Sequence, residues 1–313
     1  MPYDGSQLVR AIRRLGSVPD SGSTGSRDTD VLSVATDVLR SQLVPRVLNL
    51  RESYFVLRER TTLAAGKTRY RLPSKAAFNR LKDLWYVSGD DRIQLDVLDP
   101  SDLDEYVGTG GPAPAGYFLE GNDVQLVPTT GNYTGDLEFV YFARPGSLVM
   151  PAAARQVVAV STTTVTLASA APTGWDDTDT FDVHSPFSGA EYKAWGVGAA
   201  SVVGDTIVFD QDVEAAAVFG SGPVEIGDWV VLEGDAALPA LPDELQPLLV
   251  RAVAAQYAES VGDLQAVQTH TQILEKYLGE AAKAMEVRIE DRPIRPGANG
   301  KGMLRYVRRG WWG

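Results

Sequence analysis

Asp182, His184 and Ser185 are the residue types of a nucleophilic hydrolase, in which a histidine takes the proton of a serine and a carboxylate orients the histidine. Such a serine stands on a sharp turn between a strand and a helix, and no helix-forming pattern follows Ser185. The chain has only two histidines. We therefore expect His184 to be a surface residue, His270 to lie on the solvated face of a helix, and the protein not to be an enzyme.

A cluster of aspartates around this histidine has the ligand chemistry of a calcium site. It lacks the glycine and the later glutamate of the usual calcium-binding loop, so a solvated acidic loop is the favoured interpretation. Thiolate metal sites are excluded because the chain has no cysteine. The sequence therefore predicts no metal and no cofactor. The aspartates concerned are Asp176, Asp177, Asp179 and Asp182.

Trp175, Trp195 and Trp229 carry the side chain that commonly stacks on sugar rings. A small β module also needs large side chains at its centre, and tryptophan supplies much buried area there. The favoured interpretation is therefore three core anchors. A platform that binds glycans stays open as the alternative.

Several segments have the apolar spacing of helices, which have to position any site. A short helix is predicted over 6–15, and one long amphipathic helix runs from Leu32 to Tyr54 with a kink at Pro45. Two further helices close the chain, separated by Gly262 and Asp263. This one-turn break predicts an antiparallel helix pair.

Between the helices the pattern changes to a period of two, which is typical of strands. Residues 55–63 and 70–72 are predicted to form one hairpin, and 84–87 and 93–97 another. In the next part, 164–167 resembles 206–209, and 180–183 resembles 228–231. This weak repeat predicts a small duplicated barrel or sandwich. Residues 151–236 hold two basic and thirteen acidic side chains, and we expect them to form a peripheral insertion.

The order of the elements predicts an α+β fold. A helical core, made of the long N-terminal helix and the C-terminal helix pair, is interrupted by antiparallel β modules and followed by an extended C-terminal tail. The predicted divisions are the first half of the helical core at 1–55 with a linker at 16–29, the antiparallel β module at 56–150, the acidic all-β insertion at 151–236, the second half of the helical core at 237–290, and a basic, aromatic tail at 291–313.

The composition excludes several classes of protein. The chain lacks a stretch of about 18 apolar residues and an uninterrupted apolar segment near its N-terminus, so we expect neither a membrane span nor a secretory signal. An isoelectric point near 4.7 argues against wrapping nucleic acid. An acidic wall that repels DNA would suit a passage through which DNA slides.

The end of the chain differs from its acidic body. From Arg292 to Gly313 there are six Arg or Lys and no Asp or Glu, and the segment ends in two tryptophans. Trp and Arg are enriched at binding hot spots, which favours a docking arm over a frayed terminus. Its predicted docking residues are Arg295, Lys301, Leu304, Arg305, Tyr306, Arg308, Arg309, Trp311 and Trp312.

Two stretches of this sequence resemble the head-to-tail adaptor (connector) proteins of tailed bacteriophages, which dock under the portal ring. The first is DVLRSQLVPRVLNLRESYFVLRERTTLAAGKTRYRLPSKAAFNRLKDLWYV at 37–87, and the second is LPALPDELQPLLVRAVAAQYAESVGDLQAVQ at 238–268. Together they cover the helical core and the first strands, about a third of the chain.

The resemblance implies a structural virion protein at the head–tail junction, present in the host cytoplasm during assembly. Such adaptors form rings, usually of twelve copies, that join the portal protein to a tail or nozzle protein below and let DNA pass without specific binding. The resemblance also implies that the tail reaches the portal and that the helices form the ring wall. The predicted ring contacts are Leu39, Leu43, Val253 and Tyr257.

Two other functions stay open. One is a glycan-binding or glycan-degrading virion protein, motivated by the three tryptophans. The other is a non-viral scaffold with an acidic interaction domain.

Overall fold

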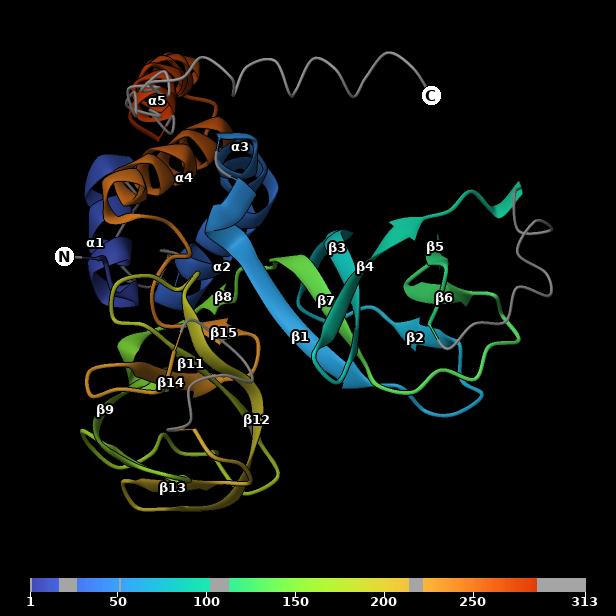
Figure 1. Cartoon of the computed structure of the whole chain (residues 1–313). Coiled ribbons are helices and arrows are strands. Elements are labelled where there is room, and N and C mark those ends of the chain that lie inside the picture. Colours follow the sequence, from blue (N-terminus) through green and yellow to red (C-terminus); the bar gives the residue numbers. More distant parts are fainter. Residues whose placement is uncertain (1, 17–26, 51, 102–112, 214–221, 286–313) are drawn as a thin grey trace, which may run out of the picture.

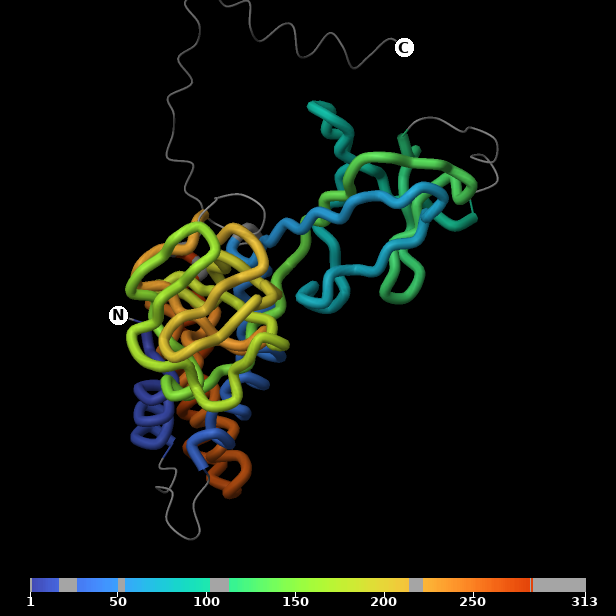
Figure 2. Tube along the Cα trace, turned by 90° about the horizontal axis from the view of Figure 1, so that it is seen from below, coloured from blue at the N-terminus to red at the C-terminus, as the bar shows by residue number. Residues whose placement is uncertain are grey.

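The computed structural model describes residues 2–16, 27–50, 52–101, 113–213 and 222–285. The fold is α+β, as predicted from the sequence, with three parts (Figure 1). A helical core lies above a closed β-barrel in the view of Figure 1, and an open β-sheet projects to one side. Figure 2, turned by 90°, shows the same sheet standing apart from the stack of helices and barrel.

The N-terminal helices form the first half of the helical core. Their buried positions recur every three or four residues, as in Val31, Leu32, Ala35 and Val38, so one apolar face packs inward. The elements are α1 (Gly5–Gly16), α2 (Asp28–Val38), a π-helical turn η1 (Leu39–Leu43), α3 (Val44–Leu50) and a 3₁₀ turn η2 (Glu52–Phe55).

The π turn ends at Leu43, two residues before Pro45, where the sequence predicts a kink. Within this turn the N–H of Val44 donates to the carbonyl of Leu39, five residues earlier. Pro45 has no N–H to continue the regular ladder, so the helix widens over one turn and then resumes.

The C-terminal helices are an antiparallel pair, as predicted. Gly262 adopts a φ of 78°, which reverses the chain between them. Asp263 then caps the second helix, accepting the N–H of Ala266 at 2.9 Å. Leu264, the first residue of the second helix, is 71% exposed. The elements are the 3₁₀ turn η5 (Asp243–Leu245), α4 (Gln246–Ser260) and α5 (Leu264–Met285).

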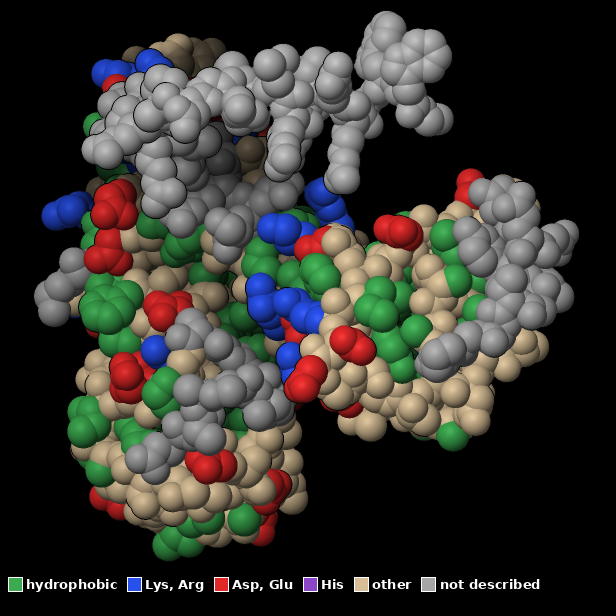
Figure 3. Space-filling model, in the orientation of Figure 1, with side chains coloured by type: hydrophobic (Ala, Val, Ile, Leu, Met, Phe, Trp, Pro, Cys, Tyr) green, Lys and Arg blue, Asp and Glu red, His purple; other side chains and the backbone are tan. Residues whose placement is uncertain are grey.

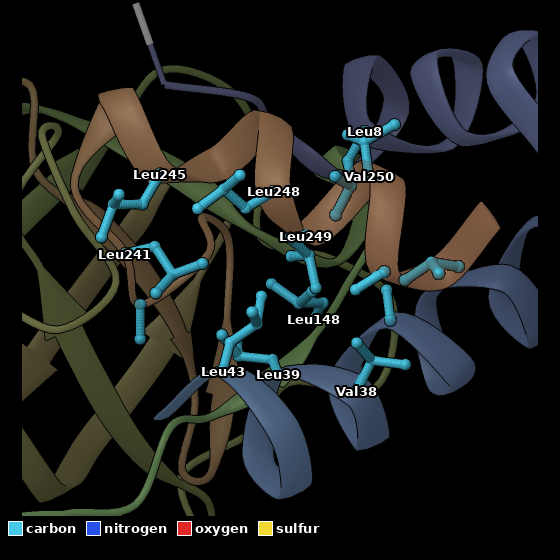
Figure 4. Packing of buried hydrophobic residues seen from close by; sticks show 14 of the residues in the cluster. Leu8, Val38, Leu39, Leu43, Leu148, Leu241, Leu245, Leu248, Leu249 and Val250 are labelled. Carbon is cyan, nitrogen blue, oxygen red and sulfur yellow. The ribbon is translucent and has the colours of Figure 1, made fainter. Parts of the chain in front are cut away.

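Both ends of the chain build one hydrophobic core (Figure 4). Leu8, Leu39 and Leu43 come from the N-terminal helices, and Leu249 from α4 packs between them. Leu148, which precedes the barrel in sequence, fills the centre of the same cluster.

The sheet has seven strands within the described residues, in the order β1-β7-β3-β4-β5-β6-β2. Neighbouring strands are antiparallel except β4 and β5, which run parallel, so the sheet is mixed. Its strands are β1 (Val56–Thr62), β2 (Arg69–Arg71), β3 (Ala76–Ser88), β4 (Asp91–Val97), β5 (Gly116–Glu120), β6 (Asp123–Val127) and β7 (Asp136–Ala143).

One of the two hairpins predicted for this sheet is wrong. The strands β3 and β4 do form a hairpin over 84–95. In contrast, β1 pairs with β7 and β2 pairs with β6, so the segments 55–63 and 70–72 lie at opposite edges of the sheet. The turn at 64–67 is present, but the chain does not fold back on itself.

The barrel is a closed ring of six strands in the order β10-β13-β12-β11-β14-β9. Alternating side chains fill its interior, among them Phe181, Ile207 and Phe209. Its strands are β9 (Arg155–Ser161), β10 (Thr164–Leu167), β11 (Thr180–His184), β12 (Tyr192–Val203), β13 (Thr206–Phe209) and β14 (Trp229–Leu232).

The segments with similar sequences are neighbours in this barrel. β10 pairs with β13, with Val165 opposite Ile207, and β11 pairs with β14. The strand order has an internal symmetry. If β9 is exchanged with β12, β10 with β13 and β11 with β14, every strand keeps a pair of neighbours that the observed order also contains. This strand order is the one expected if the two halves of the barrel are a duplicated unit related by a twofold axis.

The barrel is inserted in sequence but is not separate in space. Tyr192 and Trp195 from β12 belong to the core of the sheet, and Ala190 belongs to the helical core. Two short strands, β8 (Ser147–Leu148) and β15 (Asp235–Ala236), pair in parallel below the helices. The expectation of a peripheral module is therefore wrong in this respect, because the barrel contributes side chains to both neighbouring cores.

Candidate interaction surfaces

A buried ion pair joins the sheet to the barrel. The ammonium group of Lys75 donates to both carboxylate oxygens of Asp182, at 2.6 and 2.5 Å. The same carboxylate accepts the N–H groups of Gly196 and Gly234, both at 2.9 Å. Asp182 has no solvent exposure, and these four bonds satisfy a charge that would otherwise be costly to bury.

A pocket of about 290 Å³ lies beside this pair. Arg40, which lines it, donates to the carbonyl of Pro145 at 3.0 Å and to Oγ of Ser147 at 3.1 Å. Burial, and then the nearby charge of Arg144, lower the pKa of Arg40. Arg40 thus ties the π turn η1 to the segment that leads into the barrel, and Arg144 donates to the carbonyl of Ala76 in the sheet at 3.3 Å. The junction therefore fixes how the three parts are oriented.

One face of the sheet carries a cluster of arginines around Glu138. This carboxylate is only 3% exposed, and Arg60 binds one of its oxygens at 2.9 Å while Arg92 binds the other. Arg58 lies at 4.0 Å, and the guanidinium of Arg92 stacks 4.2 Å from the ring centroid of Trp85. Three arginines share one carboxylate, so the cluster presents positive charge to solvent. Figure 3 shows Lys and Arg side chains gathered where the sheet meets the other two parts.

A groove of about 460 Å³ separates the start of α4 from the end of α5. Buried leucines form its floor, and Tyr277, 47% exposed, stands on one wall. The guanidinium of Arg251 lies 6.0 Å from the ring centroid of Tyr277. The groove is lined by Glu244, Leu245, Pro247, Leu248, Arg251, Tyr277, Glu280 and Ala281.

The structure corrects the prediction for both histidines. His184 is fully buried, its ring stacks 4.3 Å from Tyr192, and its Nε2 lies 3.1 Å from the carbonyl of Asp235. Burial lowers the pKa of His184, so it stays neutral at physiological pH. Ser185 instead bonds through its N–H to the carbonyl of Glu191. His270 is half-buried, rather than on a fully solvated face.

The aspartates considered for calcium are divided between two roles. Asp176 accepts the N–H of Thr178 at 2.8 Å, and Asp179 accepts the N–H of Asp176 at 2.9 Å, so both stabilise a surface turn. Asp182 holds Lys75, as described above. In the parts of the chain that the structure describes, three or more His, Asp or Glu side chains do not converge in a way that could hold a metal ion.

The three tryptophans pack against core residues. Trp175 meets Phe181 edge-on at 5.1 Å in the barrel core, and Trp195 meets Tyr192 at 6.1 Å in the core of the sheet. Trp229 packs against a small cluster that contains Val231. These positions agree with the interpretation as core anchors.

The residues predicted from sequence to form contacts are placed as follows. Leu39, Leu43 and Val253 are buried in the chain's own helical core, where their side chains stabilise the subunit. Tyr257 is half-buried at the edge of that core. The tail residues lie outside the described residues: Arg295, Lys301, Leu304, Arg305, Tyr306, Arg308, Arg309, Trp311 and Trp312. Sequence analysis missed Lys75, Glu138 and the groove, because their partners are distant in sequence.

A family model described as SU10 adaptor protein matches residues 3–178, more than half of the chain. The chain belongs to the SU10 adaptor protein family. This family consists of phage head–tail adaptors, so the chain is a phage structural adaptor. The match includes the N-terminal helices, the sheet and the first strands of the barrel. No curated protein matches the chain. Within the described residues, none of the adaptor's helices is long and apolar enough to cross a membrane.

Proposed function

We propose that this adaptor assembles as a ring, of twelve copies by resemblance to phage adaptors, that joins the portal to the tail and lets DNA pass. The observation that carries the proposal is the family match over 3–178, which includes the N-terminal helices and the sheet. The ring would lie at the head–tail junction of the virion. Its partners would be the portal protein, a tail or nozzle protein, and further copies of the same chain.

The shape of the subunit supports a ring. A cyclic ring needs two different, complementary surfaces on each subunit, because each copy contacts its neighbours head to tail. The sheet and the barrel project from the helices in different directions and differ in charge, since the sheet exposes the arginines around Glu138 and the barrel part is strongly acidic. The junction at Lys75 and Asp182 would hold these two surfaces at a fixed angle.

The tail is proposed to attach the ring to the portal. Trp311 and Trp312 offer rigid aromatic anchors, and Arg305, Arg308 and Arg309 offer bidentate partners for carboxylates. In a ring, many tails would bind at once, so weak single contacts would sum to firm attachment.

The alternatives lose their support. The glycan-binding hypothesis rested on three tryptophans, which pack against core residues. The non-viral scaffold hypothesis is not compatible with membership of a phage adaptor family. The hydrolase-like set considered from the sequence does not form among the described residues, since the Nε2 of buried His184 contacts the backbone carbonyl of Asp235.

Binding to purified portal rings tests the proposal. The full chain should sediment with portal, and deletion of 303–313 should abolish binding while the protein stays folded. Reversing Arg308 and Arg309 to Glu should weaken binding and reduce its salt dependence, because charged contacts are screened by salt. Arg71→Glu, an exposed arginine on strand β2, is the matched control and should bind normally.

Two results would count against this function. If the full chain neither binds portal nor forms rings with it, the adaptor role is wrong. If the truncated chain binds with unchanged affinity, the ring stands but the tail is not its attachment.

A further inference from the structure

The groove between η5, α4 and α5 is an apolar site with an acidic rim. Leu245 and Leu248 form its floor and are almost fully buried, while half of the Tyr277 side chain is open to solvent on the wall. Glu244 and Glu280 stand on the rim and are exposed. A volume of about 460 Å³ lies within the range of pockets that bury small ligands or aromatic side chains.

The last eleven residues of the same chain have the complementary chemistry. The sequence MLRYVRRGWWG, residues 303–313, combines apolar and aromatic side chains with three arginines and has no acidic residue. Tryptophan side chains match the apolar floor, and the guanidinium groups match the carboxylates of Glu244 and Glu280. The described part of the chain also stops beside the groove, because α5 ends at Met285, about one turn beyond Ala281.

The segment between α5 and the tail is long enough for the tail to reach back to the groove. Residues 286–302 separate the end of α5 from the tail, and the ends of a linker of this length lie on average about 20–25 Å apart. Such a tether holds the tail near the groove at an effective concentration on the order of millimolar. A second copy of the protein would need a comparable concentration in solution to compete.

We infer that the groove binds residues 303–313 of the same chain when no portal is present. This goes beyond the proposed function, since it gives the tail a second site on the adaptor itself. The docked tail would keep two tryptophans from exposing an adhesive apolar surface. Portal would then have to displace the tail from the groove.

The absence of cysteine from the chain permits a clean disulfide test. The full-length variant Ala281→Cys with Gly313→Cys places one thiol in the groove and one beside Trp312, leaving both tryptophans intact. The control is Lys283→Cys with Gly313→Cys. Lys283 is exposed, closer to the tail along the chain, and about 200° around the helix from Ala281.

Oxidation at low micromolar protein should form an intrachain disulfide at least about tenfold faster in the groove pair than in the control pair, since docking raises the local thiol concentration. Adding Arg308→Glu and Arg309→Glu should reduce this difference. Equal rates in the two pairs would overturn the inference, and so would disulfides formed only between chains, which would assign the groove to a second copy. Portal binding is measured separately, so failure of this test leaves the adaptor function intact.

Discussion

The barrel and the sheet are both built from short strands, yet they are stabilised in different ways. The barrel is closed, so every strand has a partner on both sides, and its interior is filled by its own side chains. The sheet is open, with β1 and β2 as edges, and its core includes Tyr192 and Trp195 from the barrel. A closed barrel can therefore serve as the support on which an open sheet is completed.

The two parts also neutralise buried carboxylates differently. Asp182 in the barrel depends on Lys75 from the sheet, 107 residues away in sequence. Glu138 in the sheet is held by Arg60 of β1 and Arg92 of β4, two strands of the same sheet. The pair of Lys75 and Asp182 joins the sheet to the barrel. The cluster around Glu138 stays within the sheet and leaves its arginines at the surface, where they could contact an acidic partner.

The largest effect is expected from Asp182→Asn, which breaks the connection between the two parts. The substitution removes the close counter-charge of the buried Lys75 ammonium and leaves only the carboxylate of Glu233, at 3.9 Å. Breaking a buried ion pair typically costs about 3–5 kcal/mol. Urea denaturation should show a correspondingly lower free energy of unfolding. Asp177→Asn, an exposed aspartate of the same module, is the control and should leave the midpoint unchanged.

The double variant Lys75→Met with Asp182→Asn separates the ion pair from the other hydrogen bonds of Asp182. Both variants change the acceptor of the Gly196 and Gly234 N–H groups in the same way, and only the single variant leaves the ammonium of Lys75 beside a neutral side chain. Recovery of most of the lost stability is expected. If the double variant is as unstable as Asp182→Asn, the ion pair is not the reason for the loss.

The helices and the barrel could be predicted from sequence better than the strand pairing of the sheet. The helices were predicted because each has a continuous apolar stripe, and the barrel was suggested by similar segments that turned out to be adjacent strands. The hairpin over 55–72 was wrong because the true partner of β1, strand β7, begins 74 residues after β1 ends. Local alternation indicates that a strand exists but not which strand it pairs with.

The candidate surfaces were harder to predict than the fold. His184 has polar neighbours in sequence, yet the closed barrel and Tyr192 bury it. Leu39 and Val253 carry an obvious apolar pattern, but the pattern cannot tell a core within the subunit from a contact between subunits. The groove depends on how α5 packs across α4, which no single stretch of sequence encodes.

The sheet should be weakened less than the junction by Glu138→Gln. The change removes the negative charge that Arg60 and Arg92 share, and a hydrogen bond to a charged group contributes about 1.5–3 kcal/mol. A decrease of that size in the free energy of unfolding is expected. Glu120→Gln, an exposed partner of Arg69, should change nothing measurable. An equal loss in both variants would show that the buried cluster has no special role.

A pH-dependent effect is expected in the barrel from Asp228→Asn. Burial raises the pKa of Asp228 from 3.8 to about 6, so the folded state keeps a proton that the unfolded state releases between these values. The contribution of Asp228 to the free energy of unfolding therefore falls by at most about 3 kcal/mol as the pH rises from about 4 to 6. Asparagine stays neutral and can still accept the N–H of Glu225, which Asp228 accepts at 2.7 Å.

The stability of the variant minus that of the wild type should therefore be larger at pH 7 than at pH 4.5. Asp235, whose pKa burial also raises to about 6, and His184, whose pKa burial lowers, are present in both proteins. The difference in melting temperature between the two proteins thus isolates Asp228. A difference that does not change with pH would contradict this assignment.

The smallest effect should come from Arg69→Ala at the edge of the sheet. Arg69 pairs with Asp123 at 2.7 Å and with Glu120 at 3.3 Å, but all three side chains face solvent, where such pairs contribute little. The unfolding midpoint should stay unchanged. A marked loss would mean that this edge of the open sheet is stabilised by charge, as the junction is.

The most direct test of the adaptor assignment is cryo-electron microscopy of the phage particle. The account predicts a ring of this chain at the head–tail junction, below the portal, with density for helices, sheet and barrel in every subunit. It also predicts contacts between neighbouring subunits through two different surfaces, since the ring is cyclic. Density for this chain in a tail fibre or in the capsid shell, with another protein below the portal, would contradict the account.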